Sequence, residues 1–239
     1  MRKSVISYQL SVNQQPIPTT YYSLLTTHYS LLMITYKIEH SPAYASLQLD
    51  LQVNETVLVE SGAMAAMDSC IKMKSKMKGG LIKGIGRMVG GESLFVSEFT
   101  AEGRAGQLFL SPGVPGDIQH YYLDGNSLML QSSGFIASSS TVTIDPSFQG
   151  FKGFFSGESL FLLRVTGKGD LWFSSYGAII EIPIEGDYVV DTSYVVAFES
   201  SLNYHVEMIG GLSFKNLRTG ILGGEGLVCR FRGKGKLWV

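Results

Sequence analysis

The sequence has few of the residues on which catalytic or metal sites are usually built. Its 239 residues include two cysteines, Cys70 and Cys229, in no metal-ligand or redox spacing. We expect both to be buried small hydrophobic residues in a reducing compartment, although the spacing leaves a disulfide between them open. The four histidines stand alone, at His28, His40, His120 and His205. A cupin-type metal site needs histidines and a carboxylate at close spacing, so we expect no metal, no cofactor and no enzymatic activity.

Long apolar segments are also absent. No stretch approaches the roughly 18 consecutive apolar residues of a membrane-spanning helix, and the N-terminus lacks the apolar run and cleavage site of a secretory signal. The default expectation is a cytoplasmic protein. Charged residues make up only 16% of the chain and apolar residues 45%, with 28 glycines. This balance is typical of a strand-rich globular fold with many tight turns.

Charge is unevenly distributed along the chain. The formal net charge is −1, yet no acid occurs between Asp68 and Glu92, where six residues are basic. They are Lys72, Lys74, Lys76, Lys78, Lys83 and Arg87. An anionic partner, if there is one, is expected at this segment.

The alternation from Ile71 to Lys78 predicts a strand with four lysines on one face. We favour a solvated edge strand, because lysine protects such an edge against aggregation. Together with the apolar and basic segment that follows, the same strand would suit the surface of an anionic membrane, with which the protein would associate peripherally. RNA binding is the weaker alternative, because the rest of the chain is net negative and the basic segment lacks interleaved aromatics.

A short motif recurs three times, with its glutamates 66 and 67 residues apart. It reads GESLF at 91–95, GESLF at 157–161 and GEGLV at 224–228, and each copy leads through apolar residues and glycines to a leucine–aromatic pair. Self-similarity at a fixed period predicts one β-rich unit used three times. The apolar runs flanking the glycines at 103–106, 167–169 and 233–235 predict a β-hairpin in each copy.

The repeated glutamates are Glu92, Glu158 and Glu225. We interpret them as structural carboxylates that accept hydrogen bonds from backbone N–H groups where each strand begins, because repetition in all units favours a role in the fold. The alternative is a ring of carboxylates around a shared ligand.

The repeat divides the chain into β unit 1 at 33–111, β unit 2 at 112–177 and β unit 3 at 178–239, joined in one body. Residues 1–32 contain no acid and no copy of the motif. We expect them to be an extension outside the fold, with Met33 the natural first residue, whereas a transit peptide is the alternative.

From Met33 onward the chain resembles the altered-inheritance-of-mitochondria protein 24 family. The matching segments are Met33 to Tyr36, Glu60 to Met64, Gly79 to Leu81, and Arg87 through Phe95. The resemblance implies an all-β fold similar to that of the tryptophan RNA-binding attenuation protein (TRAP), with three tandem units of the TRAP-like, double-stranded β-helix type in pseudo-threefold repeat. It also implies homotrimers, and eukaryotic members of this mitochondrial biogenesis family are tied to the organisation of the mitochondrial inner membrane.

Together these features predict a non-enzymatic oligomeric scaffold or interaction protein, with an anionic membrane surface as a second partner. A small-ligand or RNA-binding module is the runner-up, and a cupin-like enzyme comes third. The missing histidine cluster argues against the enzyme, and the basic segment favours an anionic surface.

Overall fold

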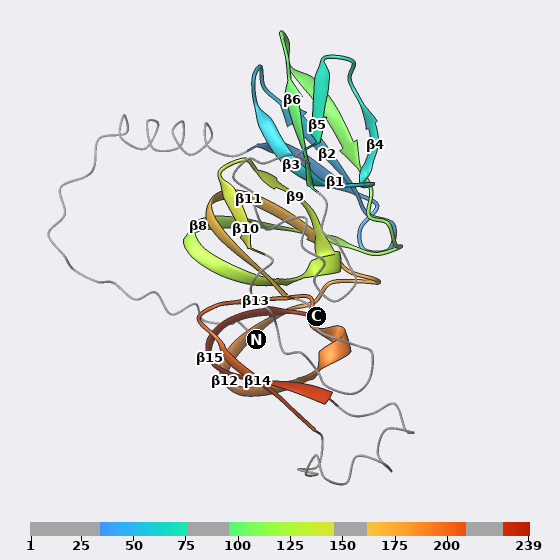
Figure 1. The fold of residues 1–239 in the computed structure, drawn as a ribbon. Coiled ribbons are helices and arrows are strands. Elements are labelled where there is room, and N and C mark those ends of the chain that lie inside the picture. The colour runs from blue at the N-terminus through green and yellow to red at the C-terminus, as the bar shows by residue number, and fades with distance from the viewer. Residues whose placement is uncertain (1–33, 76–95, 146–161, 209–226) are drawn as a thin grey trace, which may run out of the picture. The chain divides into compact units, whose positions relative to one another are not determined.

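The fold consists of antiparallel β-strands (Figure 1). This computed structural model describes residues 34–75, 96–145, 162–208 and 227–239, all of which lie in one unit, Ile34–Val239. The described residues form fifteen strands and two short 3₁₀ helices, with no α-helix among them. The all-β prediction is therefore confirmed.

The elements follow one another as β1 (Thr35–Glu39), β2 (Ser46–Leu51), β3 (Thr56–Glu60), β4 (Met64–Met67), β5 (Ile71–Ser75), β6 (Val96–Ala101), β7 (Gly106–Leu110), β8 (Ile118–Gln131), η1 (Ser132–Gly134), β9 (Phe135–Ser139), β10 (Val142–Asp145), β11 (Leu162–Ser174), β12 (Glu181–Asp191), η2 (Thr192–Tyr194), β13 (Ala197–Glu199), β14 (Asn203–Met208) and β15 (Leu227–Trp238).

The strands form two sheets. A four-stranded sheet has the order β1-β2-β7-β4, and an eleven-stranded sheet has the order β12-β15-β13-β8-β11-β9-β3-β6-β5, with β10 paired to β11 and β14 paired to β15. Strands that are far apart in sequence thus lie side by side.

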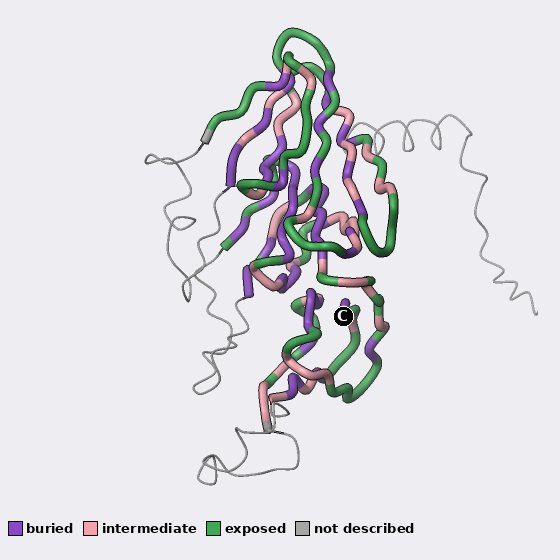
Figure 2. The backbone as a smooth tube through the Cα atoms, turned by 90° about the vertical axis from the view of Figure 1, so that its right-hand side faces the viewer, coloured by how far each residue is buried: buried purple, intermediate pink, exposed green. Residues whose placement is uncertain are grey.

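Side-chain alternation explains why these segments are strands that cover a core. In β2, Leu47, Leu49 and Leu51 are fully buried while the intervening polar residues point outward. Figure 2 shows that buried and exposed positions also follow one another along other parts of the chain. The largest buried side chains are Trp172 on β11 and Trp238 on β15, and they belong to two different clusters of the hydrophobic core.

The predicted hairpins are wrong. β11 and β15 each continue through their glycine pair as one strand, and each pairs over its length with one partner, β8 or β12. In the first copy, β6 and β7 are separate strands that lie in different sheets. Gly167 and Gly233 have φ of +116° and +124°, so they allow a strand to bend where we expected a turn. A positive φ occurs in hairpin turns and in strand bends alike, so the glycine pattern alone could not tell the two apart.

Candidate interaction edge

One open edge of the eleven-stranded sheet is formed by β12. Among the described strands, β12 pairs only with β15, from Glu181 opposite Trp238 to Asp191 opposite Val228. Pro183 lacks a backbone N–H, and it lies in this edge strand opposite Lys236. Tyr188 and Val189 in the second half are 40% and 43% exposed. This half therefore combines unpaired backbone groups with exposed apolar side chains.

A second open edge is formed by β4, the last strand of the four-stranded sheet. In the described part of the chain, β4 pairs only with β7. Its four residues, MAAM, are all exposed, and Met64 and Met67 are 37% and 40% exposed. The strand carries no charge that would keep another strand away.

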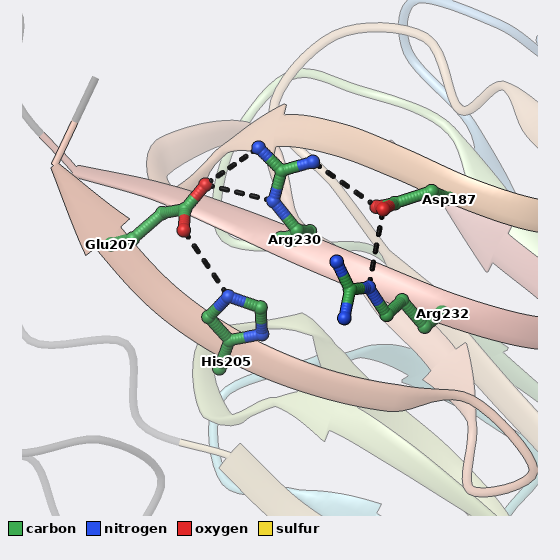
Figure 3. A network of polar contacts seen from close by, with 5 residues as sticks. All are labelled: Asp187, His205, Glu207, Arg230 and Arg232. Carbon is green, nitrogen blue, oxygen red and sulfur yellow. Dashed lines mark hydrogen bonds and ion pairs between the residues drawn. The ribbon is translucent and has the colours of Figure 1, made fainter. Parts of the chain in front are cut away.

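A network of ion pairs joins β12, β15 and β14 beside the β12 edge (Figure 3). The Arg230 guanidinium donates to Glu207 Oε1 at 2.8 Å and to Asp187 Oδ1 at 3.2 Å. Arg232 Nε donates to Asp187 Oδ2 at 3.1 Å, and His205 Nε2 lies 3.2 Å from Glu207 Oε2. Arg230 lies on the middle strand, β15, and binds a carboxylate on each of its neighbours, β12 and β14.

The charges in this network stabilise one another. Hydrogen bonds from Arg230 hold the pKa of Glu207 below its usual value, and the bond to Glu207 raises the pKa of Arg230. Desolvation is the largest influence on the pKa of Asp187 and raises it, but the bonds and charges of Arg230 and Arg232 together outweigh desolvation and lower the pKa. Acidic and basic side chains alternate on this face and pair with one another. The face therefore suits a role in positioning the edge strand β12 better than a role in binding an anion.

Two further ion pairs continue the same pattern along β12 and β15. Lys234 Nζ lies 3.1 Å from Glu185 Oε1, and Lys236 Nζ lies 2.8 Å from Glu181 Oε1. These side chains span adjacent antiparallel strands, so opposite charges face each other along most of β12 and β15.

The lysine strand is only partly described, as β5. Ile71 is buried, Lys72 and Lys74 are exposed, and β5 ends its sheet among the described strands as predicted. Met73, expected on the apolar face, is 54% exposed. Lys74 Nζ lies 3.6 Å from Glu102 Oε1. The other basic residues of the segment, Lys76, Lys78, Lys83 and Arg87, lie outside the described residues, as do Glu92, Glu158 and Glu225 and residues 1–32.

A buried polar cluster was missed by sequence reasoning. The Asp170 side chain is fully buried, and its Oδ1 lies 2.8 Å from His120 Nε2. Its Oδ2 accepts the Ile34 N–H at 2.9 Å, and its own N–H donates to Ser139 Oγ at 2.9 Å. The Tyr36 ring packs at 4.4 Å from the His120 ring. The sequence signal was a single acid followed by Leu-Trp-Phe, which marks a charge at the start of an apolar run.

The contacts of this cluster are those of a structural group. Asp170 connects the backbone that precedes β1 to β8, β9 and β11, so it joins segments up to 136 residues apart. Within the described ranges, no three His, Cys, Asp or Glu side chains come together as metal ligands would. His120 is a residue of β8 whose ring contacts the Asp170 carboxylate and the Tyr36 ring.

The two cysteines are free thiols, so the disulfide alternative is wrong. Cys229 is buried as expected, and burial raises its pKa to about 12, so the thiol stays protonated and unreactive. Cys70 is only partly buried, because it lies in the turn before β5, with its Sγ 3.6 Å from the Ala105 carbonyl oxygen.

A pocket of about 720 Å³ lies along the turns that follow β3, β7, β8, β11 and β12. Its lining includes Tyr176, Tyr194, five serines and Glu60. The size suits a small ligand, but no cluster of reactive groups points to a particular chemistry. Small-ligand binding therefore stays a prediction.

The part of the chain that the structure describes contains no helix able to cross a bilayer. The fold and its edges define an all-β protein of two antiparallel sheets, each of which ends, among the described strands, in a strand with one open side. The chain belongs to the family described as "Mitochondrial biogenesis AIM24", which matches residues 36–239. The resemblance inferred from the sequence is thereby confirmed.

Two relatives come from Streptococcus pyogenes. An uncharacterised protein of serotype M6 is 28% identical over 214 residues, which cover 85% of this chain and 84% of the relative. The X-ray crystal structure of a further S. pyogenes protein superposes with a TM-score of 0.69 at 27% identity, over 86% of this chain and 92% of that one. The fold is thus shared with a bacterial protein over nearly its whole length.

Proposed function

We propose that this protein is a non-enzymatic scaffold made of three tandem TRAP-like β units, whose copies assemble head to tail into a homotrimer. The recurring pattern of strand pairs supports the three units. In the first unit β2 pairs with β7, β7 with β4, β3 with β6 and β6 with β5. The two halves of β8 and β11, with β9 and β10, make the same four pairs, and so do the halves of β12 and β15, with β13 and β14.

A backbone contact repeated three times supports the same units. After a glycine at 106, 169 or 235, the next N–H donates to a side chain at the end of a short strand. The three bonds run from Gln107 to Asp68 at 2.9 Å, from Asp170 to Ser139 at 2.9 Å and from Lys236 to Glu199 at 3.0 Å. At each glycine a Cβ would lie within 3 Å of a neighbouring side chain, namely that of Cys70, Ser139 or Ser201. A Cβ would force one of these side chains to move, and glycine avoids that shift at all three positions.

The observation that carries the proposal is how the units are joined. The first unit pairs with the second through β3 and β9, and the second with the third through β8 and β13. Each junction uses one edge from each unit, so the two end units keep one such edge each, at β4 and β12. Identical chains satisfy such edges head to tail, and a rotation that closes gives a ring instead of a fibre.

The assembly is tested by light scattering after size exclusion. We expect a species with three times the chain mass of 26.1 kDa at micromolar concentration. Val189→Lys places a charge on the open edge and should yield monomers, whereas Val53→Lys, at a position 50% exposed in the turn before β3, should leave the trimer intact. A wild-type monomer would contradict the scaffold, and a dimer would contradict the closed trimer alone.

A second function, contact with anionic lipid, is favoured by the exposure of Lys72 and Lys74 on edge strand β5. Such residues contribute about 1 kcal/mol each near a negative surface. We expect co-sedimentation with phosphatidylserine vesicles at low salt, loss of binding at high salt, and loss after replacing Lys72, Lys74, Lys76 and Lys78 by serine.

The matched control for lipid binding is Lys234→Ser with Lys236→Ser, which removes two lysines that already face carboxylates. This variant should bind vesicles as the wild type does. Binding that survives the four serine substitutions, or that does not occur at low salt, would contradict an electrostatic contact at β5.

A further inference from the structure

The two junctions between units have one register. Across the first, the pairs are Val57 with Ser139, Leu58 with Ser138 and Val59 with Ala137. Across the second, they are Leu128 with Glu199, Met129 with Phe198 and Leu130 with Ala197. Both junctions are antiparallel.

Pairing inside the units identifies the matching residues at the open edges. On β12, Tyr188 takes the place of Val57 and Leu128. Each of the three lies opposite a buried residue of the neighbouring strand, which is Phe231 on β15, Phe99 on β6 or Val165 on β11. On β4, Met67 takes the place of Ser138 and Phe198, because each lies opposite a leucine, at Leu108, Leu171 or Leu237. The neighbours follow from these positions, so Val189 matches Leu58 and Met129.

Residues at the open edges are more exposed than the matching residues at the internal junctions. This is the difference expected if a neighbouring strand covers only the internal ones. Leu58 and Met129 are 6% and 4% exposed, but Val189 is 43% exposed. Likewise Ser138 and Phe198 are fully buried, but Met67 is 40% exposed. The apolar residues at both open edges are those that a neighbouring unit covers elsewhere in the chain.

We propose that β4 of a second copy of this chain pairs with β12 in the register of the internal junctions. Tyr188 then lies opposite Asp68 of the other copy, Val189 opposite Met67 and Val190 opposite Ala66. This inference rests on the proposed head-to-tail assembly and specifies its interface. Burial of the Val189 and Met67 side chains against each other supplies the apolar contact.

Backbone bonds at the second internal junction extend the interface. There the Gln131 N–H donates to the Val196 carbonyl at 2.9 Å, and the Ser200 N–H donates to the Ser127 carbonyl at 3.0 Å. The matching groups are the Asp191 N–H with the Ala65 carbonyl of the other copy, and the other copy's Ser69 N–H with the Asp187 carbonyl.

The described edges differ in how well they suit this role. β5 carries Lys72 and Lys74, and lysine on an edge strand opposes addition of another strand. β4 has four uncharged residues, and the two internal junctions use its counterparts β9 and β13. The partner is therefore β4 and not a second β12 or β5.

Disulfide trapping tests the register. Directly opposed residues in antiparallel strands have Cα atoms about 4.5–5.5 Å apart, within the range a disulfide spans. We expect Val189→Cys with Met67→Cys, in a Cys70→Ser background, to give disulfide-linked dimers and trimers on non-reducing gels after mild oxidation. Each single variant should remain a single-chain band.

A second pair distinguishes this inference from the scaffold proposal. Val189→Cys with Met73→Cys, in the same background, places the second thiol on β5, where the residue is 54% exposed. If the protein is trimeric but only this pair cross-links, or neither does, the β4 register is wrong while the scaffold stands. If the wild type is a monomer by light scattering, both proposals fail.

Discussion

Replacing Asp170 with alanine should lower the free energy of unfolding by about 3 kcal/mol, because it leaves buried polar groups without partners. The Asp170 carboxylate is fully buried and meets the Ile34 N–H at 2.9 Å and His120 Nε2 at 2.8 Å. The Ile34 N–H and the largely buried His120 ring would lose this acceptor. Asp170→Asn keeps the shape and one acceptor oxygen, so it should lose less.

Urea denaturation at matched protein concentration measures the effect, because an oligomer's stability depends on concentration. The control is Asp124→Ala, which removes an ion pair with Lys168 at 2.8 Å whose side chains are 58% and 55% exposed. That change should cost under about 0.5 kcal/mol. A loss below about 1 kcal/mol for Asp170→Ala would show that the cluster does not hold the strands together.

Gly116→Ala should also be strongly destabilising, by about 2–3 kcal/mol, because the fold leaves no room for a methyl group. A Cβ at this position would lie 1.7 Å from the Ser175 carbonyl oxygen and 3.0 Å from the Gly177 nitrogen. Both are backbone atoms beside the parallel bridge between Gly116 and Gly177, so the chain itself must shift. For a chain of this size, the melting temperature should fall by about 5–10 °C.

Gly113→Ala is the matched control in the same loop. A Cβ there meets nothing within 4 Å, so the melting temperature should stay unchanged or rise slightly. Equal effects of the two alanines would contradict the close contact at Gly116.

Part of the fold could be predicted from the sequence. The composition predicted a strand-rich chain, and the lysines at Lys72 and Lys74 predicted that their strand, β5, ends a sheet. Both signals are local, because composition and the charges along one strand do not depend on which other strands it pairs with. The exposure of Val189 on the β12 edge could not be read from the sequence, since its counterparts Leu58 and Met129 are equally apolar and are buried.

By itself the sequence determined that the protein is all-β, that the lysine strand lies at the end of a sheet, and the family it resembles. Only the tertiary structure decided that Gly167 and Gly233 bend single strands, that Asp170 meets the Ile34 N–H, and that the other described strands leave one side of β4 and β12 open. The physical reason is that backbone preference and side-chain period act over a few residues, whereas strand pairing depends on segments that are distant in sequence. Glycine permits a positive φ in a turn or a bend alike, and the strands packed around it select one of the two.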